Sequence, residues 1–177
     1  GFLQATIEGE NAIIESVILA LNENKKTKLI CELFCGSGTI TLPLLKKSYQ
    51  IHAFELDKES LKSLDIAARK ESFGNRVKTK VRDLKNFPLT SDELSKYDAI
   101  IVNPPRSGAK LQFLNIARSN VSIIISISCN VNTFVRDAKI LIESNYELKW
   151  VQPIDQFLFS AHVELVAIFQ LKYKNVN

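Results

Sequence analysis

Short apolar runs alternate along this chain with segments of helical periodicity, and this alternation restricts the fold more than any other feature. The apolar runs are rich in β-branched residues and end in glycine, proline or a polar residue, as buried strands do. Seven runs are predicted strands: residues 28–34, 49–56, 76–83, 97–105, 122–129, 147–154 and 162–172. Apolar residues three and four positions apart predict helices over residues 8–24, 39–47, 57–73, 111–119 and 132–144.

Strands that alternate with helices predict a mostly parallel sheet with helices on both faces. The last two predicted strands have no helix between them, so they should pair antiparallel at one edge. A seven-stranded, mostly parallel sheet with an antiparallel C-terminal strand pair resembles the Rossmann-like fold of class I, S-adenosylmethionine-dependent methyltransferases. We therefore predict an α/β protein of this kind. With 177 residues, 46% of them hydrophobic, residues 1–177 should form one catalytic domain.

Composition restricts the class of protein. No apolar run approaches the roughly 20 residues of a membrane helix, and three cysteines, an odd number, argue against a disulfide framework. We expect a monomer in the cytoplasm, with no membrane partner. The net charge of +4 is compatible with a nucleic-acid partner. The basic stretch "RVKTKVRDLK" (residues 76–85) is either a phosphate-facing surface or the solvated face of a strand.

The first predicted strand ends in the turn "CGSG", where Gly36 and Gly38 let the backbone turn sharply and approach a ligand. The turn lacks the Gly-Lys-Ser/Thr of a phosphate loop and the third glycine of a dinucleotide fingerprint. Such a turn suits an uncharged nucleoside, such as the adenosine of S-adenosylmethionine. Glu55 follows Gly36 by 19 residues, close to the about 20 expected of a carboxylate that accepts both ribose hydroxyls. Asp57 fits a helix N-cap, and Asp83 is either an acceptor for the adenine amino group or an ordinary strand-end residue.

The fourth predicted strand ends in "NPPRSG". This resembles the Asn/Asp-Pro-Pro-aromatic segment with which exocyclic-amine methyltransferases hold a target amino group, although Arg106 replaces the aromatic residue. Two prolines restrict the backbone, so Asn103 should be presented rigidly. Asn103, Pro104 and Arg106 are therefore candidates for holding a target base.

Cys129 ends the fifth predicted strand and precedes a helix, whose N-terminus should lower the pKa of a thiol. A nucleophile is one interpretation of this cysteine; a buried packing residue is the other, and we expect packing for Cys31 and Cys35. Glu164 opens the last apolar strand. It is either a buried carboxylate, which is costly unless it is paired or used, or an edge-strand carboxylate exposed to water. The spacing of Cys31 and Cys35 does not form a Cys-x-x-Cys pair, so no metal site is predicted.

Six segments, in order, resemble the RNA uracil-5 methyltransferase family, which makes 5-methyluridine in ribosomal and transfer RNA. They are "FLQA", "ELFCGSGT", "FELD", "NPPRSG", "SCN" followed by "RDAKIL", and "PIDQF" followed by "HVE". The resemblance runs from Phe2 to about Phe169. It implies S-adenosylmethionine as the cofactor, Cys129 as the nucleophile that adds to uracil C6, and Glu164 as the base that removes the C5 proton.

The resemblance further implies that Gln4, Phe34, Glu55 and Asn103 line the cofactor and the reacting uracil. The family usually has Asp at the position of Asn103 and Pro at that of Val131. It also implies an RNA partner, with ribosomal RNA favoured over transfer RNA, and no metal in this domain. Family members carry N-terminal RNA-binding regions ahead of this segment, so we expect the chain to be the catalytic domain alone.

Two other functions fit parts of the sequence. An exocyclic-amine methyltransferase would use the "NPPR" segment and would not need a cysteine nucleophile. A non-catalytic domain that binds cofactor or RNA would follow if the absent upstream regions, or Asn103 in place of Asp, abolished turnover.

Overall fold

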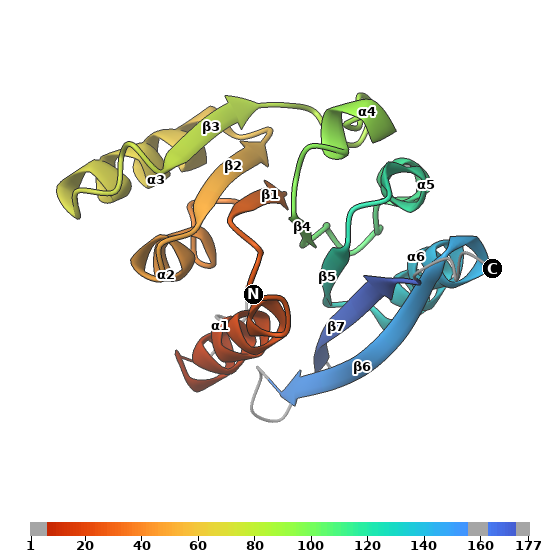
Figure 1. The fold of residues 1–177 in the computed structure, drawn as a ribbon. Helices are drawn as coiled ribbons and strands as arrows, with labels where there is room; N and C mark the ends of the chain where they lie inside the picture. The colour runs from red at the N-terminus through yellow and green to blue at the C-terminus, as the bar shows by residue number, and fades with distance from the viewer. Residues whose placement is uncertain (1–6, 156–162, 173–177) are drawn as a thin grey trace.

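The computed structural model describes residues 7–155 and 163–172, which form a seven-stranded sheet between two layers of helices (Figure 1). The strands are β1 (Leu29–Leu33), β2 (Gln50–Glu55), β3 (Val77–Val81), β4 (Ala99–Val102), β5 (Ile123–Ser128), β6 (Tyr146–Asp155) and β7 (Val163–Leu171). The helices are α1 (Ile7–Asn22), α2 (Thr41–Lys46), α3 (Lys58–Lys70), α4 (Ser91–Leu94), α5 (Lys110–Ser119) and α6 (Val131–Ser144).

The strand order of the sheet is β3-β2-β1-β4-β5-β7-β6. The first five strands pair in parallel, whereas β7 runs antiparallel to both β5 and β6. The predicted fold class and the antiparallel C-terminal pair are thus confirmed. The order reverses between β1 and β4, so the loops that follow these strands diverge and leave a crevice at the carboxyl ends, where open α/β sheets bind their ligands.

The sheet divides the hydrophobic core into two parts, because alternate side chains of a strand face opposite layers. In β1, Ile30 belongs to the core formed with α1, α2 and α3, whereas Cys31 belongs to the core formed with α4, α5 and α6. With both faces covered, β4 and β5 consist entirely of buried residues. This double burial is why the strands are continuous apolar runs in the sequence.

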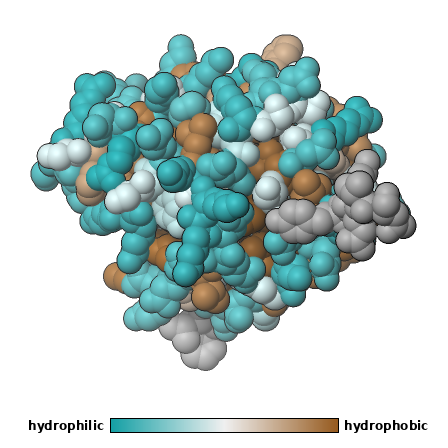
Figure 2. All heavy atoms as spheres, viewed as in Figure 1, coloured by the Kyte–Doolittle hydropathy of each residue, from teal (hydrophilic) through white to brown (hydrophobic). Residues whose placement is uncertain are grey.

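The exterior is largely polar. Figure 2 shows hydrophilic residues over most of the face that it presents, with apolar residues visible between them. Among residues 7–155 and 163–172, no helix has both the length and the apolar character needed to cross a membrane.

Two helix starts are set by local capping. Asp57 accepts the backbone N–H of Ser60 and caps α3, as its position predicted. Helix α4 lies in a segment where no helix was predicted. There Thr90 accepts the N–H of Glu93 while the Glu93 carboxylate accepts the N–H of Thr90. This reciprocal pair is a capping box, and its Thr-x-x-Glu spacing was present in the sequence as a signal.

Candidate active site

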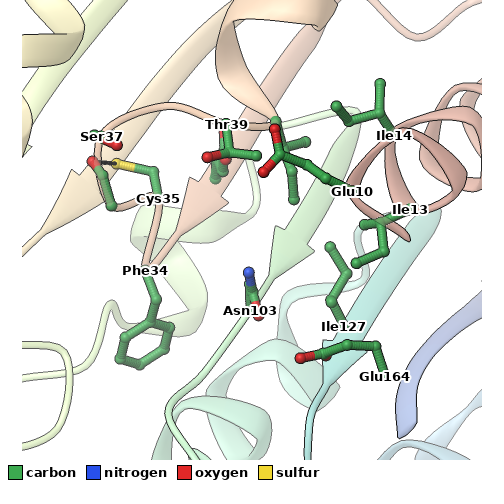
Figure 3. Close-up of a pocket in the computed structure, with 13 residues that line it drawn as sticks. Glu10, Ile13, Ile14, Phe34, Cys35, Ser37, Thr39, Asn103, Ile127 and Glu164 are labelled. Carbon is green, nitrogen blue, oxygen red and sulfur yellow. Dashed lines mark hydrogen bonds between the residues drawn. The ribbon is translucent and has the colours of Figure 1, made fainter. Parts of the chain in front are cut away.

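The loop after β1 turns sharply into the crevice because Phe34, Gly36 and Gly38 all have positive φ angles, of 62°, 55° and 94°. A side chain at Gly38 has no room, since an added Cβ would overlap Cδ1 of Leu64. At Phe34 a non-glycine residue holds the left-handed conformation, and such strain concentrates at functional sites. The half-buried Phe34 ring lines the crevice (Figure 3). The predicted glycine turn is therefore present, with Phe34 at its entrance.

Glu55, at the end of β2, holds this loop in place. Its Oε2 accepts the backbone N–H of Gly36 at 3.0 Å, and its Oε1 accepts the next two N–H groups of its own chain at 2.7 and 3.2 Å. A carboxylate has about four acceptor sites, so the free capacity lies on Oε2 and suits one ribose hydroxyl rather than the expected two. Glu55 lines a hollow together with Asp83 and Asn103, which we call the nucleoside hollow.

Asp83, after β3, closes a local turn. Its Oδ1 accepts the N–H groups of Lys85 and Asn86, and its Oδ2 accepts from the Asn86 side-chain amide at 2.7 Å. These hydrogen bonds, led by that of the Asn86 side chain, lower the pKa of the Asp83 carboxyl. Turn formation accounts for this aspartate, and its contact with adenine stays a prediction.

A hollow of about 300 Å³ extends from the loop after β1 to helix α1 and strand β7 (Figure 3). Three carboxylates line it, from Glu10, Glu32 and Glu164, and its described lining contains no lysine or arginine. This acidic hollow suits a ligand that carries positive charge. It meets the nucleoside hollow at Phe34 and Asn103, which line both.

Glu32 was not among the residues predicted from sequence. It is 2% exposed and its Oε2 accepts the Thr41 hydroxyl at 2.7 Å. Burial raises the pKa of the Glu32 carboxyl from 4.5 to about 7. A carboxylate inside the continuous apolar run of a buried strand was the available signal, because such a group is costly unless it has a partner or a use.

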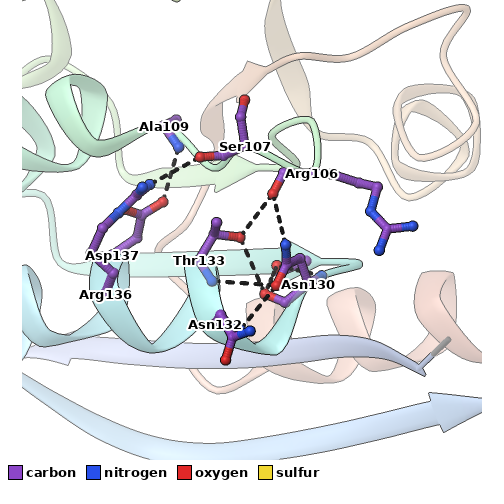
Figure 4. A network of polar contacts seen from close by, with 9 residues as sticks. Arg106, Ser107, Ala109, Asn130, Asn132, Thr133, Arg136 and Asp137 are labelled. Carbon is purple, nitrogen blue, oxygen red and sulfur yellow. Dashed lines mark hydrogen bonds and ion pairs between the residues drawn. The ribbon is translucent and has the colours of Figure 1, made fainter. Parts of the chain in front are cut away.

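The loop after β4 presents the predicted base-binding residues. Asn103 is exposed and its side chain lies in the acidic hollow near Glu164 (Figure 3). Pro104 is buried and lines the nucleoside hollow. Arg106 is exposed, and its side chain points away from the polar network that holds its backbone (Figure 4). All three lie along the crevice, and their contacts with a target base stay predictions.

Helix α6 fastens this loop from one side (Figure 4). The Arg106 carbonyl accepts from Asn130 Nδ2 and from Thr133 Oγ1, both at 3.1 Å. One helical turn further along α6, Arg136 donates to the Ser107 carbonyl. The buried Asp137 carboxylate accepts the backbone N–H of Ala109, later in the same loop, at 2.9 Å. The loop therefore takes its position from the helix that begins directly after Cys129.

Strand pairing brings Cys129 and Glu164 together. In the antiparallel pairing of β5 with β7, Ser128 lies opposite Leu165. Cys129 lies in the bend directly after β5, and continuing this register by one residue would set it opposite Glu164, whose carboxylate acts on the thiol. Residues directly opposite in an antiparallel pair have Cβ atoms about 4.5–5.5 Å apart and share one face of the sheet. Ile127, two residues before Cys129, lines the acidic hollow beside Glu164 (Figure 3), so this face is the one that opens to the crevice.

The electrostatics of the thiol differ from the sequence expectation. Burial raises the pKa of Cys129, the Glu164 carboxylate raises it further, and Arg106 lowers it in part. The net direction is upward, whereas the N-terminus of α6 was expected to lower it. The Asn130 side chain already accepts the N–H groups of Asn132 and Thr133, so the end of the helix is capped. Burial likewise raises the pKa of Glu164.

Cys31 and Cys35 are buried in the two cores, as predicted, whereas Cys129 is half-buried. Within the described part of the chain, no group of three or more His, Cys, Asp or Glu side chains is placed to hold a metal ion. Gln4 lies outside the described residues.

Solved structures share this fold. A Pyrococcus abyssi tRNA (uracil-54, C5)-methyltransferase in complex with S-adenosyl-L-homocysteine matches with a TM-score of 0.75 and 24% identity, over 96% of this chain and 40% of that one. The magnesium protoporphyrin IX methyltransferase of Synechocystis matches with a TM-score of 0.71 and 15% identity, over 96% and 90% of the two chains. At these identities the similarity shows the fold alone.

A family model identifies the family, and sequence relatives agree with it. Uncharacterized RNA methyltransferases of Agrobacterium fabrum and Mesorhizobium japonicum are each 45% identical, over 96% and 94% of this chain. The chain spans about 40% of the length of these relatives. Residues 1–172 match the family model described as tRNA (Uracil-5-)-methyltransferase. The chain therefore belongs to the tRNA (uracil-5-)-methyltransferase family.

Proposed function

We propose that this chain is the catalytic domain of an S-adenosylmethionine-dependent RNA methyltransferase that methylates C5 of a uridine through a covalent bond between Cys129 and C6. The observation that supports the proposal is that Cys129 directly follows the last residue of β5 that pairs with β7, close enough to Glu164 for the carboxylate to act on the thiol. A nucleophile and a base on one face can act on the two adjacent carbons of a single pyrimidine ring. Family membership supports the reaction type.

The described residues fit the cofactor. Its ammonium and sulfonium charges suit the acidic hollow, and its adenosine suits the nucleoside hollow, where Glu55 offers a free acceptor site. Phe34 lines both hollows, and the positive φ angles of Gly36 and Gly38 turn the loop that carries it. When bound, the cofactor supplies an electrophilic methyl group on sulfur. We propose cofactor-binding roles for these residues and for Asp83, Asn103 and Gln4.

The residues of this chain provide a nucleophile that activates uracil C5 and a base that removes its proton. C5 of uracil is too weak a nucleophile to take a methyl group unaided. Addition of the Cys129 thiolate to C6 moves the electron pair of the C5–C6 double bond to C5, with negative charge shared by the O4 oxygen, and C5 then accepts the methyl group. Glu164 removes the remaining C5 proton, the double bond re-forms, and the thiolate leaves. The raised pKa of Glu164 suits a base that must accept a proton.

Arg106 and Asn103 act around this ring in our proposal. Arg106 favours the thiolate form of Cys129 and is placed to hold the base or its neighbouring phosphate. Asn103, whose side chain lies between the hollows, hydrogen-bonds the base without adding charge, and rigid Pro104 keeps it there. The base must leave its stack to reach this depth.

We infer an RNA substrate for the whole protein, ribosomal RNA rather than transfer RNA, and action as a monomer in the cytoplasm. Nucleoside analysis of ribosomal and transfer RNA from cells with and without the gene tests the choice of RNA. Loss of 5-methyluridine from transfer RNA alone would contradict the ribosomal assignment.

Covalent trapping tests the mechanism. A base can remove a proton from C5 but cannot remove fluorine in this way. RNA that contains 5-fluorouracil should therefore stay covalently bound to the full-length protein after methyl transfer. Cys129→Ala should abolish this adduct. Glu164→Gln should form an adduct with ordinary uridine RNA, since only release is slowed. An adduct that survives Cys129→Ala would overturn the proposal. Methyl transfer to nitrogen with Cys129→Ser active would favour an exocyclic-amine methyltransferase.

A further inference from the structure

A third hollow, of about 350 Å³, opens between the turn after β3 and the start of α5, beside the loop that carries Asn103 and Arg106. We infer that it binds an RNA nucleotide next to the methylated uridine, with the phosphate on its basic rim and the base on its apolar wall. This inference rests on the proposed function, because it needs an RNA strand at Cys129. We call this feature the flanking hollow.

Charge separates this hollow from the acidic one. Lys85, Lys110 and Arg136 line the flanking hollow, and its described lining contains no Asp or Glu. The acidic hollow has the opposite composition, with three carboxylates and no cation among its described residues. A polyanionic RNA backbone is attracted to the first and repelled by the second, whereas a cationic cofactor has the reverse preference.

Arg136 is held ready to bind an anion. Its Nε donates to Asp137 Oδ1 at 2.8 Å and its Nη2 donates to the Ser107 carbonyl at 3.2 Å. Nη2 also forms an ion pair with Asp137 Oδ1 at 2.8 Å, and this pairing with a carboxylate that is only 3% exposed orients the Arg136 side chain, which is 41% exposed. Among the described residues no hydrogen bond is recorded for Nη1, and its two N–H groups suit a phosphate oxygen.

An apolar wall faces these cations. Phe34, Leu84 and Leu111 line the same hollow, and Leu111 remains 55% exposed although it is a large apolar residue. Cationic grooves with apolar or aromatic walls are how proteins hold single-stranded nucleic acid, since the backbone contacts the charges and the base packs on the wall.

The hollow is also continuous with the crevice. It shares Phe34, Leu84, Lys85 and Pro105 with the nucleoside hollow. Its wall at Ser107 directly follows Arg106, which acts on the Cys129 thiol. A strand whose target base reaches Cys129 would therefore pass Arg106 on its way to the flanking hollow.

The basic stretch of residues 76–85 contributes only Lys85 to this surface. Arg76 lies over the Phe73 ring, and Arg82 donates to the carbonyls of Phe87 and Pro88. Both arginines have structural partners, and Lys78 and Lys80 line another hollow with His52 and Tyr97. Lys85 is therefore the part of this stretch that lies at the flanking hollow.

RNA affinity of Lys110→Gln in the full-length protein tests the inference, because Lys110 lines this hollow and neither of the other two. A single-stranded target fragment is titrated by fluorescence anisotropy, without cofactor, from 50 to 200 mM KCl. Loss of one phosphate contact should weaken binding and reduce the slope of log Kd against log salt by about 0.7. Lys110→Arg should restore the slope. Lys139→Gln, a control on α6 with a 70% exposed side chain paired to Glu143, should bind like the parent protein.

Replacing phosphates one at a time by neutral methylphosphonates locates the contact. Replacement at one position adjacent to the target uridine should weaken RNA binding to the parent protein. The same replacement should not weaken RNA binding to Lys110→Gln further. Equal slopes for Lys110→Gln and Lys139→Gln, or loss of S-adenosylmethionine binding by calorimetry in Lys110→Gln, would overturn the inference.

Failure of the proposed function gives a different result. If RNA binds with these salt slopes but 5-fluorouracil RNA forms no adduct at Cys129, the flanking hollow still contacts RNA and the reaction assignment fails. If the adduct forms normally and Lys110→Gln changes nothing, the reaction stands and the flanking hollow does not bind RNA.

Discussion

Burial raises the pKa of the Cys129 thiol, and two single residues of opposite charge act on it as well. The Glu164 carboxylate of β7 raises the pKa further, while Arg106, in the loop after β4, lowers it. The free protein therefore keeps the thiol protonated, and the proposed mechanism requires that substrate binding favour the thiolate.

Substitution of the two neighbours should move the thiol pKa in opposite directions. Glu164→Gln removes a negative charge and should shift alkylation of Cys129 by iodoacetamide to lower pH, whereas Arg106→Gln should shift it to higher pH. Peptide mass spectrometry across a pH series measures both, with buried Cys31 and Cys35 as unreactive references. Shifts of the same sign would contradict this electrostatic assignment.

The buried Glu32 carboxyl should make stability fall as pH rises. Its pKa is about 7 in the folded chain and near 4.5 when exposed, so the folded state binds more protons between these values. The contribution of Glu32 to the free energy of unfolding therefore decreases from pH 4.5 to about 7, by roughly 3 kcal/mol, and is constant above.

Glu32→Gln should remove this slope, because the amide oxygen still accepts the Thr41 hydroxyl but carries no charge. Urea unfolding at pH 5, 6, 7 and 8 compares the two proteins. The variant should gain stability relative to the parent as pH rises, and parallel pH profiles would show that Glu32 does not titrate in this range.

At the scale of elements, the loop after β4 and helix α6 form one unit. Asn130 and Thr133 hold the Arg106 carbonyl, and Arg136 and Asp137 hold the next part of the loop. Since the N-cap of α6, Asn130, directly follows Cys129, these contacts fix the loop after β4 relative to Cys129.

Gly108→Ala should disturb this unit. Gly108 has a φ of 72°, and an added Cβ would overlap Nη2 of Arg136 and lie 2.6 Å from Oδ2 of Asp137. The left-handed conformation alone costs roughly 1–2 kcal/mol, so stability should fall by at least that much, and adduct formation should slow. Gly74→Ala is the control, because Gly74 lacks a positive φ and its nearest neighbour is the Cγ of the Arg69 side chain at 3.1 Å. Equal free energies of unfolding for Gly108→Ala and Gly74→Ala would contradict the role of α6 in holding the loop after β4.

Across the whole molecule, one sheet joins two cores. Leu64 is fully buried in the core of α1, α2 and α3, and Phe113 is 1% exposed in the core of α4, α5 and α6. Every central strand contributes side chains to both. Neither helix layer can lose its packing without exposing one face of the shared sheet.

Leu64→Ala and Phe113→Ala should each destabilise the chain by roughly 2–5 kcal/mol, in one cooperative transition. Trp150, the only tryptophan, lies on β6 and donates to Glu23, so its fluorescence reports on the edge of the sheet. Its urea midpoint should coincide with that of far-ultraviolet circular dichroism in both variants. Separate midpoints would show that the cores unfold independently.

The α/β class, the glycine turn, the α3 cap and the antiparallel final pair could all be predicted from the sequence. Each depends on a local property: apolar periodicity, freedom of the backbone at Gly36 and Gly38, a side-chain acceptor at Asp57, or the absence of a helix between two strands. Local features of this kind can be predicted from the sequence because residues close together in the chain determine them.

Tertiary structure alone decided how the candidate site is assembled. Cys129 and Glu164 are 35 residues apart in the chain, and the pairing of β5 with β7, which ends at Ser128 and Leu165, is what brings them near each other. Segments that are distant in sequence also produce three other features. They are the raised pKa of Glu32, the hydrogen bond from the loop after β4 to Asp137, and the opposite charges of the acidic and flanking hollows. Their energies depend on burial and on distances of a few ångströms, which exist only once the sheet has formed.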